Sequence, residues 1–223
     1  MAGRLVMDEN EQNMREALVG AYREVAEIGL MGRAAGNLSC RVSGGMLISG
    51  SGATAKSLTP GRVVLVRDDG TWDSAVEPST EWRMHKVIYE RHDQANAIVH
   101  THSDYCVALA SNNLSLPGFH YLVGTFGGSD VPCVPYSTFG TEQLAADAAD
   151  ALTDRAACLL GNHGMISRGS DLHTAVAHAE RLEILCRQYV LAKTFGEPDV
   201  LTDEQWNEFF GRVEKVGYSE IVD

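Results

Sequence analysis

Two short turn sequences near the start of the chain constrain its fold most strongly. Ser43-Gly44-Gly45 separates the strand-forming segments 38–42 and 46–49, and Asp68-Asp69-Gly70 separates segments 62–67 and 71–74. Glycine-containing turns of this length join antiparallel strands, whereas parallel strands need a much longer crossover connection. The sequence therefore predicts two β-hairpins and a sheet that is largely antiparallel.

Helical patterns surround these strands. Apolar residues recur at three- and four-residue steps, which is typical of amphipathic helices. Ser79 or Thr80 is expected to cap a helix that follows it. Because helices and strands do not alternate strictly, we predict an α/β fold in which helices flank a mainly antiparallel central sheet, not a doubly wound parallel sheet. The expected helices cover 8–30, 79–91, 104–111, 141–153, 171–195 and 203–215, and the further expected strands cover 97–102, 121–128, 131–135 and 157–160.

The size and charge of the chain exclude several classes of protein. Its 223 residues suit one domain over 1–223, and a net charge of −12 disfavours binding to nucleic acid or to an anionic membrane surface. No apolar run approaches the ~18 residues of a membrane span. The five cysteines are widely spread without a CxxC pair, which favours reduced thiols and a cytoplasmic location.

The segment His100-Thr101-His102 carries the clearest chemical signal. Side chains alternate along a strand, so these two imidazoles are expected on one face, at a spacing that suits a shared metal ion. His163, in the sequence Gly161-Asn162-His163-Gly164 after another predicted buried strand, supplies a third imidazole. Three histidines with an open or carboxylate fourth position are typical of catalytic zinc. The alternative is a chance HxH pair among eight histidines.

Glu81 is the candidate acid–base group, and two interpretations of it are open. It stands at the start of the predicted helix 79–91. A carboxylate in the first turn of a helix is favoured by the helix dipole alone, with Ser79 as the cap. In the functional interpretation, the N–H groups of the helix start and the hydroxyls of Ser79 and Thr80 bind an anion, while Glu81 faces the metal as a ligand or base.

Two loops rich in glycine and serine, 36–39 and 49–52, suit an anion, because glycine lets backbone N–H groups approach it and serine adds donors. Hairpin loops are rich in glycine in any case, so each loop alone is weak evidence. The chain has no P-loop lysine motif, no GxGxxG after a strand and no GxSxG elbow.

Together, a metal, anion loops and a carboxylate suit proton removal from a carbon next to a carbonyl that a divalent metal polarises.

Several ordered motifs make the chain similar to a known family. From residue 14 to about residue 204 it resembles the zinc-dependent class II aldolase/epimerase family. This resemblance implies a three-layer α/β/α domain with a mainly antiparallel central sheet, and a homotetramer with active sites at subunit interfaces. The motifs are AGNLSCR (35–41), LISGSG (47–52), EPSTEWRMH (77–85), AIVHTHS (97–103), HYLVGTFGG (120–128), VPCVPYSTFGT (131–141) and LLGNHGMI (159–166).

The resemblance also implies roles for individual residues. It implies a Zn²⁺ site, with Co²⁺ or Mn²⁺ as alternatives, made by His100, His102 and His163. Glu81 would be the fourth ligand at rest and the catalytic base once substrate displaces it. Tyr121 matches a tyrosine that donates a proton in a neighbouring subunit's site, and Tyr218 is the candidate for a tyrosine of the tail. The substrate phosphate would lie among glycine, amide and hydroxyl groups, namely Gly36, Asn37, Ser51, Gly52, Ser79 and Thr80.

The position of Glu81 also classifies the chain within the family. Aldolases of the family have glutamate there, whereas the pentose-phosphate epimerases have aspartate, and the stretch 120–128 resembles the L-fuculose-1-phosphate aldolases. The resemblance therefore implies a metal-dependent aldolase that cleaves a ketose 1-phosphate to dihydroxyacetone phosphate and a small aldehyde. The open alternatives are a sugar-phosphate 4-epimerase, a decarboxylase or dehydratase of the same family, and a scaffold like the adducin head domain, which lacks the metal histidines.

Overall fold

The computed structural model describes residues 9–32 and 35–216. Its central sheet has the strand order β3-β2-β1-β4-β9-β8-β7, and every neighbouring pair is antiparallel except β7 and β8. This arrangement confirms the predicted α/β fold with a mainly antiparallel sheet. The strands are β1 (Asn37–Val42), β2 (Gly45–Ser49), β3 (Val63–Arg67), β4 (Ala97–Thr101), β7 (Cys133–Val134), β8 (Ala157–Leu160) and β9 (Gly164–Gly169).

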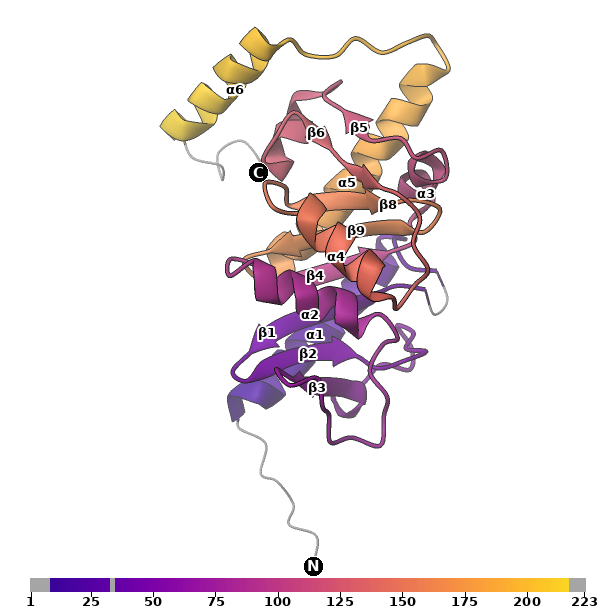
Figure 1. Cartoon of the computed structure of the whole chain (residues 1–223), viewed down its shortest axis with the longest axis vertical. Helices are drawn as coiled ribbons and strands as arrows, with labels where there is room; N and C mark the ends of the chain where they lie inside the picture. Colours follow the sequence, from indigo (N-terminus) through magenta and orange to yellow (C-terminus); the bar gives the residue numbers. More distant parts are fainter. Residues whose placement is uncertain (1–8, 33–34, 217–223) are drawn as a thin grey trace, which may run out of the picture.

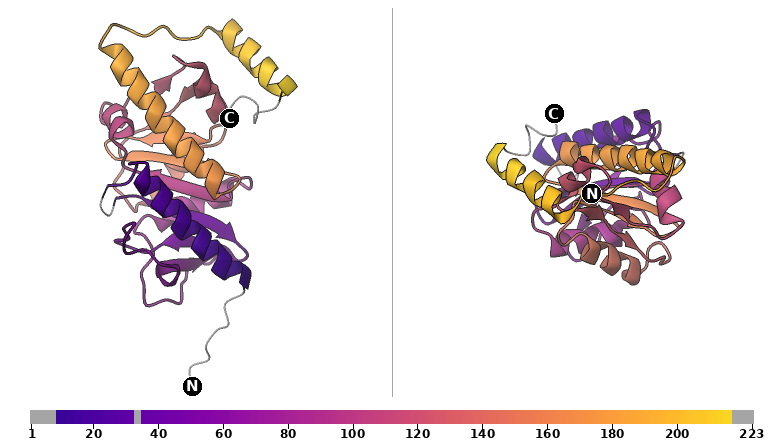
Figure 2. Two further views of the ribbon diagram at one scale, coloured as in Figure 1. Left: turned by 180° about the vertical axis from the view of Figure 1, so that it is seen from behind. Right: turned by 90° about the horizontal axis from the view of Figure 1, so that it is seen from above.

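Helices cover both faces of this sheet. In Figure 1, α2 (Trp82–Arg91) and α4 (Glu142–Ala151) lie in front of it. The view from behind in Figure 2 shows α1 (Glu9–Glu27) and α5 (Leu172–Lys193) across the opposite face. The short α3 (Asp104–Ala110) packs against α5, and α6 (Asp203–Val216) contacts the 3₁₀ helix η2 (Tyr121–Phe126). Among the described helices, none is both long and apolar enough to cross a lipid bilayer.

The alternation of side chains along β4 divides the core in two. Ala97 and Val99 join the apolar cluster under α1 and α5, whereas Ile98 joins the cluster under α2 and α4. All three are fully buried. Because residues two apart share a face of a strand, His100 follows Ile98 onto the side of the sheet covered by α2. The strand period therefore fixes which helix contributes to the site.

The predicted strand at 121–128 is wrong, because residues Tyr121–Phe126 form the 3₁₀ helix η2. The ring of His120 accepts the backbone N–H of Leu122, and Gly127, with φ of 93°, ends the helix. Gly124 lies directly against the rings of Phe209 and Trp206 from α6. The segment packs against α6, β6 and α5, and it is not paired as a strand of the central sheet.

The second predicted hairpin is also wrong, because no strand forms at 71–74. The Asp69 carboxylate accepts bonds from both the backbone N–H and the hydroxyl of Thr71. This local pairing ends the ladder after a single backbone bond from Arg67 to Thr71. A strand that sequence reasoning missed, β9, lies between β4 and β8 in the sheet. The predicted strand at 131–135 is split between β7 and β6 (Asp130–Val131), and β6 pairs with β5 (Leu116–Pro117) in a separate small sheet.

Candidate active site and metal centre

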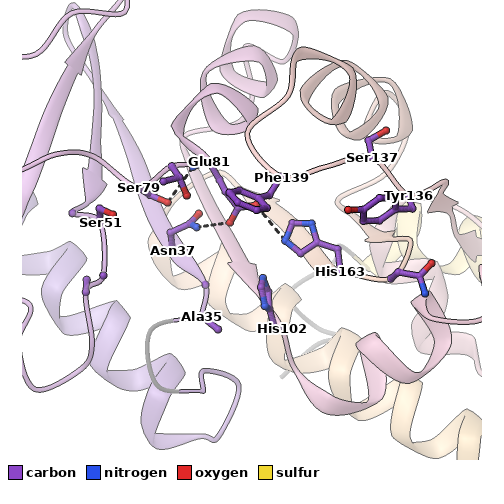
Figure 3. Close-up of a pocket in the computed structure, with 16 residues that line it drawn as sticks. Ala35, Asn37, Ser51, Ser79, Glu81, His102, Tyr136, Ser137, Phe139 and His163 are labelled. Carbon is purple, nitrogen blue, oxygen red and sulfur yellow. Dashed lines mark hydrogen bonds and ion pairs between the residues drawn. The ribbon is translucent and has the colours of Figure 1, made fainter.

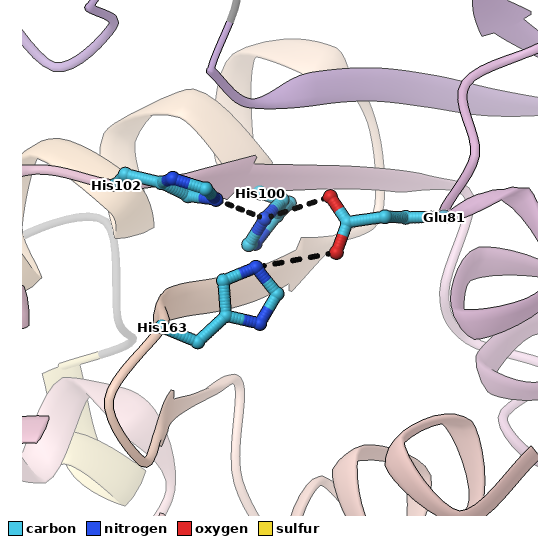
Figure 4. Close-up of side chains that lie close together, drawn as sticks. All are labelled: Glu81, His100, His102 and His163. Carbon is cyan, nitrogen blue, oxygen red and sulfur yellow. Dashed lines mark hydrogen bonds and ion pairs between the residues drawn. The ribbon is translucent and has the colours of Figure 1, made fainter. Parts of the chain in front are cut away.

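Four side chains from three distant parts of the chain converge at one end of the sheet (Figure 4). One ligand atom from each of Glu81, His100, His102 and His163 lies within 4.8 Å of the others. The Nε2 atom of His100 is 3.0 Å from Nε2 of His102 and 3.1 Å from Oε2 of Glu81. The Nε2 atom of His163 is 3.2 Å from the other carboxylate oxygen, Oε1. These are the four residues that the sequence nominated for a metal.

The three histidines are carried by two different local structures. His100 is the last residue but one of β4, and His102 directly follows the end of this strand. His163 lies in the tight turn between β8 and β9, where Asn162 adopts a φ of 52°. The next residue, Gly164, has no side chain, and a Cβ atom there would lie 2.3 Å from the carbonyl oxygen of Thr101. Glycine at this position lets the turn approach the end of β4, so that His163 reaches the other two histidines.

The donor set fits a divalent cation. His100 Nδ1 lies 2.7 Å from the Met165 carbonyl oxygen, which only accepts, so Nδ1 carries the proton and Nε2 presents a lone pair. That lone pair faces a carboxylate oxygen and a second imidazole nitrogen. Oε1 of Glu81 is buried and accepts no hydrogen bond from the described residues. Lone pairs so close to one another repel unless a cation lies between them, and a backbone partner on the far ring nitrogen is typical of metal-binding histidine.

The electrostatics of the cluster favour a positive charge beside Glu81. Burial raises the pKa of Glu81, but His100 and His163 outweigh burial, so this pKa lies far below its ordinary value and the carboxylate is ionised. Burial lowers the pKa of His100, but the attraction of Glu81 outweighs it and raises that pKa. Burial, followed by repulsion from His100 and His163, lowers the pKa of His102 to about 4. His102 is therefore a neutral ligand at pH 7, beside a fixed negative charge that attracts a cation.

The expectation that Ser79 caps helix α2 is wrong. Helix α2 begins at Trp82, and Glu81 occupies the capping position without any capping bond from its side chain. The carboxylate is directed instead toward the histidines and accepts a bond of 3.0 Å from the side-chain amide of Asn37. Ser79, expected as the cap, accepts the backbone N–H of Glu81 through its hydroxyl. Ser79 thus holds the segment that presents the carboxylate.

A pocket of about 360 Å³ opens beside the cluster (Figure 3). Glu81, His102 and His163 line it, whereas His100 is fully buried behind them. Sequence reasoning missed part of the wall, although these residues belong to segments it singled out: Tyr136, Ser137, Phe139 and Asn162. The pocket also brings together every residue nominated for the phosphate: Gly36, Asn37, Ser51, Gly52, Ser79 and Thr80.

Tyr121 lies apart from this pocket. Its side chain is 46% exposed, stacks on His120 and contacts Phe209 of α6. It is not among the residues that line the pocket of its own chain. Tyr218, the candidate tyrosine of the tail, lies outside the described residues.

The comparisons with known proteins agree with the fold and the site. The family model of the class II aldolase and adducin N-terminal domain matches residues 16–190. The chain belongs to this family.

Individual relatives of the chain are named as aldolases of different sugar phosphates. A 5-methylthioribulose-1-phosphate/5-deoxyribulose-1-phosphate aldolase of Rhodospirillum rubrum is 37% identical, over 92% of this chain and 92% of the relative. The L-fuculose phosphate aldolase of Escherichia coli is 36% identical over 84% of this chain and 88% of that protein. A solved structure of an L-fuculose 1-phosphate aldolase superposes with a TM-score of 0.86 at 33% identity, covering 91% of this chain and 96% of the other. Relatives with different substrates are thus about equally similar.

Proposed function

We propose that this protein is a zinc-dependent aldolase that reversibly cleaves a ketose 1-phosphate to dihydroxyacetone phosphate and a small aldehyde. One observation carries the proposal above the others. The ionised Glu81 carboxylate and the three histidines lie beside a pocket whose other side is lined by glycine, serine and threonine. A base, a Lewis-acid site and an anion site therefore share one cavity, as cleavage next to a carbonyl requires.

Each part of the cavity has a distinct task in this proposal. Zn²⁺, when held by the histidines, would polarise the substrate carbonyl and so lower the barrier to breaking the adjacent carbon–carbon bond. Glu81 would transfer the proton at the carbon that becomes the hydroxymethyl end of dihydroxyacetone phosphate. The hydroxyl groups of Ser51, Ser79 and Thr80 would donate to the phosphate. Their distance from Glu81 would orient the substrate with its reacting carbon at the carboxylate.

Metal analysis coupled to a cleavage assay tests this proposal. The panel contains L-fuculose 1-phosphate, 5-deoxyribulose 1-phosphate and 5-methylthioribulose 1-phosphate, because named relatives act on these compounds. We expect about one zinc per chain and metal-dependent release of dihydroxyacetone phosphate from at least one member. Zinc without cleavage of any member would contradict the aldolase assignment, and analysis of the products of other sugar phosphates would then separate epimerase, decarboxylase and dehydratase chemistry.

We also propose a homotetramer in which Tyr121 serves the pocket of a neighbouring subunit as a proton donor to the aldehyde oxygen. The proposal is supported by the position of Tyr121. This side chain is half exposed, does not line the pocket of its own chain, and contacts Phe209 of α6. To act as a proton donor, Tyr121 must therefore reach the pocket of another subunit that its own chain covers. In a closed ring of identical subunits, each copy can supply the next.

Complementation between two variants tests the shared site. Glu81→Gln and Tyr121→Phe are each expected to be poorly active, because each lacks one group of every site. Co-expression of the two chains should restore roughly a quarter of the wild-type kcat per chain, since a random assembly gives that share of sites with both groups intact. The measurement is the kcat of mixed oligomers purified through two different affinity tags. Activity no higher than that of the separate variants would place Tyr121 outside the shared site.

A further inference from the structure

A buried chain of hydrogen bonds runs from Glu81 away from the pocket. The Asn37 side-chain nitrogen lies 3.0 Å from Glu81 Oε2, and the Asn37 oxygen lies 2.6 Å from His85 Nε2. His85 Nδ1 lies 2.7 Å from the Ser39 hydroxyl, which lies 2.8 Å from the hydroxyl of Tyr89. Ser39 and His85 are completely inaccessible to solvent, and Asn37 and Tyr89 are also buried. The side chains of His85, Ser39 and Tyr89 do not line the pocket.

The charge on Glu81 sets the direction of every bond in this chain. An ionised carboxylate only accepts, so the amide nitrogen of Asn37 must face it and the amide oxygen must face His85. His85 must then carry its proton on Nε2 and present the Nδ1 lone pair to Ser39. Ser39 donates its only proton to that lone pair and can therefore only accept from Tyr89. One arrangement of protons satisfies all four bonds, provided that His85 is neutral.

Burial keeps His85 in this neutral state. Burial is the main cause that lowers the pKa of His85 to about 3. The spacing of these residues along β1 also matches their spacing along α2. Asn37 and Ser39 are two apart on β1 and share a face, whereas His85 and Tyr89 are four apart on α2 and share a stripe. The chain of hydrogen bonds is therefore built jointly by β1 and by α2, the helix that follows Glu81.

We propose that Ser39, His85 and Tyr89 are positioning residues, which lock the Asn37 amide with its nitrogen toward Glu81 and so hold the carboxylate at the metal centre. A reversed amide would set its oxygen against the carboxylate and push Oε2 away from His100. The locked amide binds Oε2 alone and leaves Oε1 without a hydrogen bond from the described residues. This inference rests on the proposed role of Glu81, and it assigns the Asn37 side chain to the carboxylate instead of to the phosphate.

The variant Ser39→Ala, compared with Ser167→Ala, tests the proposal. Both serines are completely buried on strands of the same sheet, but Ser167 donates to the Ala175 carbonyl, on the side of α5. The two variants thus lose a similar buried hydroxyl. We expect Ser39→Ala to lower kcat about tenfold with little change in KM, because the Asn37 amide would no longer be locked toward Glu81, and loss of a hydrogen-bond partner of a metal ligand typically has this size of effect. Adding Tyr89→Phe to Ser39→Ala should lower kcat no further, since the chain is already broken. Equal kcat values for Ser39→Ala and Ser167→Ala would overturn the proposal.

A second measurement does not depend on turnover. The ¹⁵N chemical shifts of histidine ring nitrogens distinguish the two neutral tautomers, and the His85 signals are those lost in His85→Gln. We expect the Nε2–H tautomer in the wild type and in Ser167→Ala, and a mixture of tautomers in Ser39→Ala. A wild-type His85 protonated on Nδ1 would overturn the proposal, because the Asn37 amide would then be reversed.

The failure of the proposed function is distinguishable from the failure of this inference. If the wild type cleaves no ketose 1-phosphate of the panel, the aldolase assignment fails while the tautomer result stands. The affinity for Zn²⁺ then replaces kcat as the readout. We expect Ser39→Ala to bind Zn²⁺ about tenfold more weakly than Ser167→Ala does, and equal affinities would overturn the positioning role.

Discussion

Replacing Glu81 by glutamine is expected to lower kcat by ~10²- to 10⁴-fold, the usual contribution of a positioned acid–base group. Glutamine has nearly the same size and keeps an oxygen that can accept from Asn37, so the segment before α2 should retain its conformation. The substitution removes the negative charge and with it the ability to take a proton. The measurement is steady-state cleavage of whichever ketose 1-phosphate the wild type accepts, with zinc content determined on the same sample.

The matched control for this variant is Glu90→Gln, which removes a carboxylate from α2, the helix that follows Glu81. Glu90 is exposed and pairs with Lys86 one turn earlier, so its loss is expected to leave kcat unchanged. The comparison separates the effect of the site from that of a changed surface charge. Full turnover by Glu81→Gln would exclude Glu81 as the base. A loss explained entirely by lost zinc would leave Glu81 only its role as a ligand.

Local periodicity accounts for the part of the site that could be predicted from sequence. The alternation in His100-Thr101-His102 depends only on neighbouring residues, and their nitrogen atoms do lie 3.0 Å apart. The prediction of a turn at 43–45 depends equally on local backbone preferences, and a hairpin joins β1 to β2 there. Where one short segment determines its own conformation, the sequence is sufficient.

The errors arose where distant segments decide the outcome. Residues 121–126 have the composition of a strand, but α6, more than 75 positions later, covers them as a 3₁₀ helix. Strand β9 was missed because Gly164 and Gly169 weaken its pattern, although close contacts with other segments require both glycines. The partnership of His85 with Asn37 depends on how α2 crosses β1. Neither segment shows this crossing by itself.

Replacing His102 by alanine is expected to weaken Zn²⁺ binding by more than ~100-fold, beyond the effect of losing a partner behind a ligand, and to abolish cleavage. His102 is the accessible member of the nitrogen pair at the pocket wall, and its lowered pKa of about 4 keeps it neutral and ready to bind at pH 7. Two histidines and one carboxylate would remain, one ligand fewer than the resting site is proposed to have. Metal analysis after dialysis and a zinc titration measure the change.

Thermal unfolding supplies an independent readout of the same loss. A ligand that binds only the folded protein stabilises it, so adding a chelator should lower the Tm of the wild type. The Tm of His102→Ala should respond little to chelator, because that variant holds little zinc. His173→Ala, which removes an exposed imidazole from the first turn of α5, is the matched control and should behave as the wild type does. If His102→Ala keeps about one zinc per chain and the wild-type response to chelator, the metal is held by another set of residues, and the convergence of His100, His102 and His163 on Glu81 must serve a different purpose.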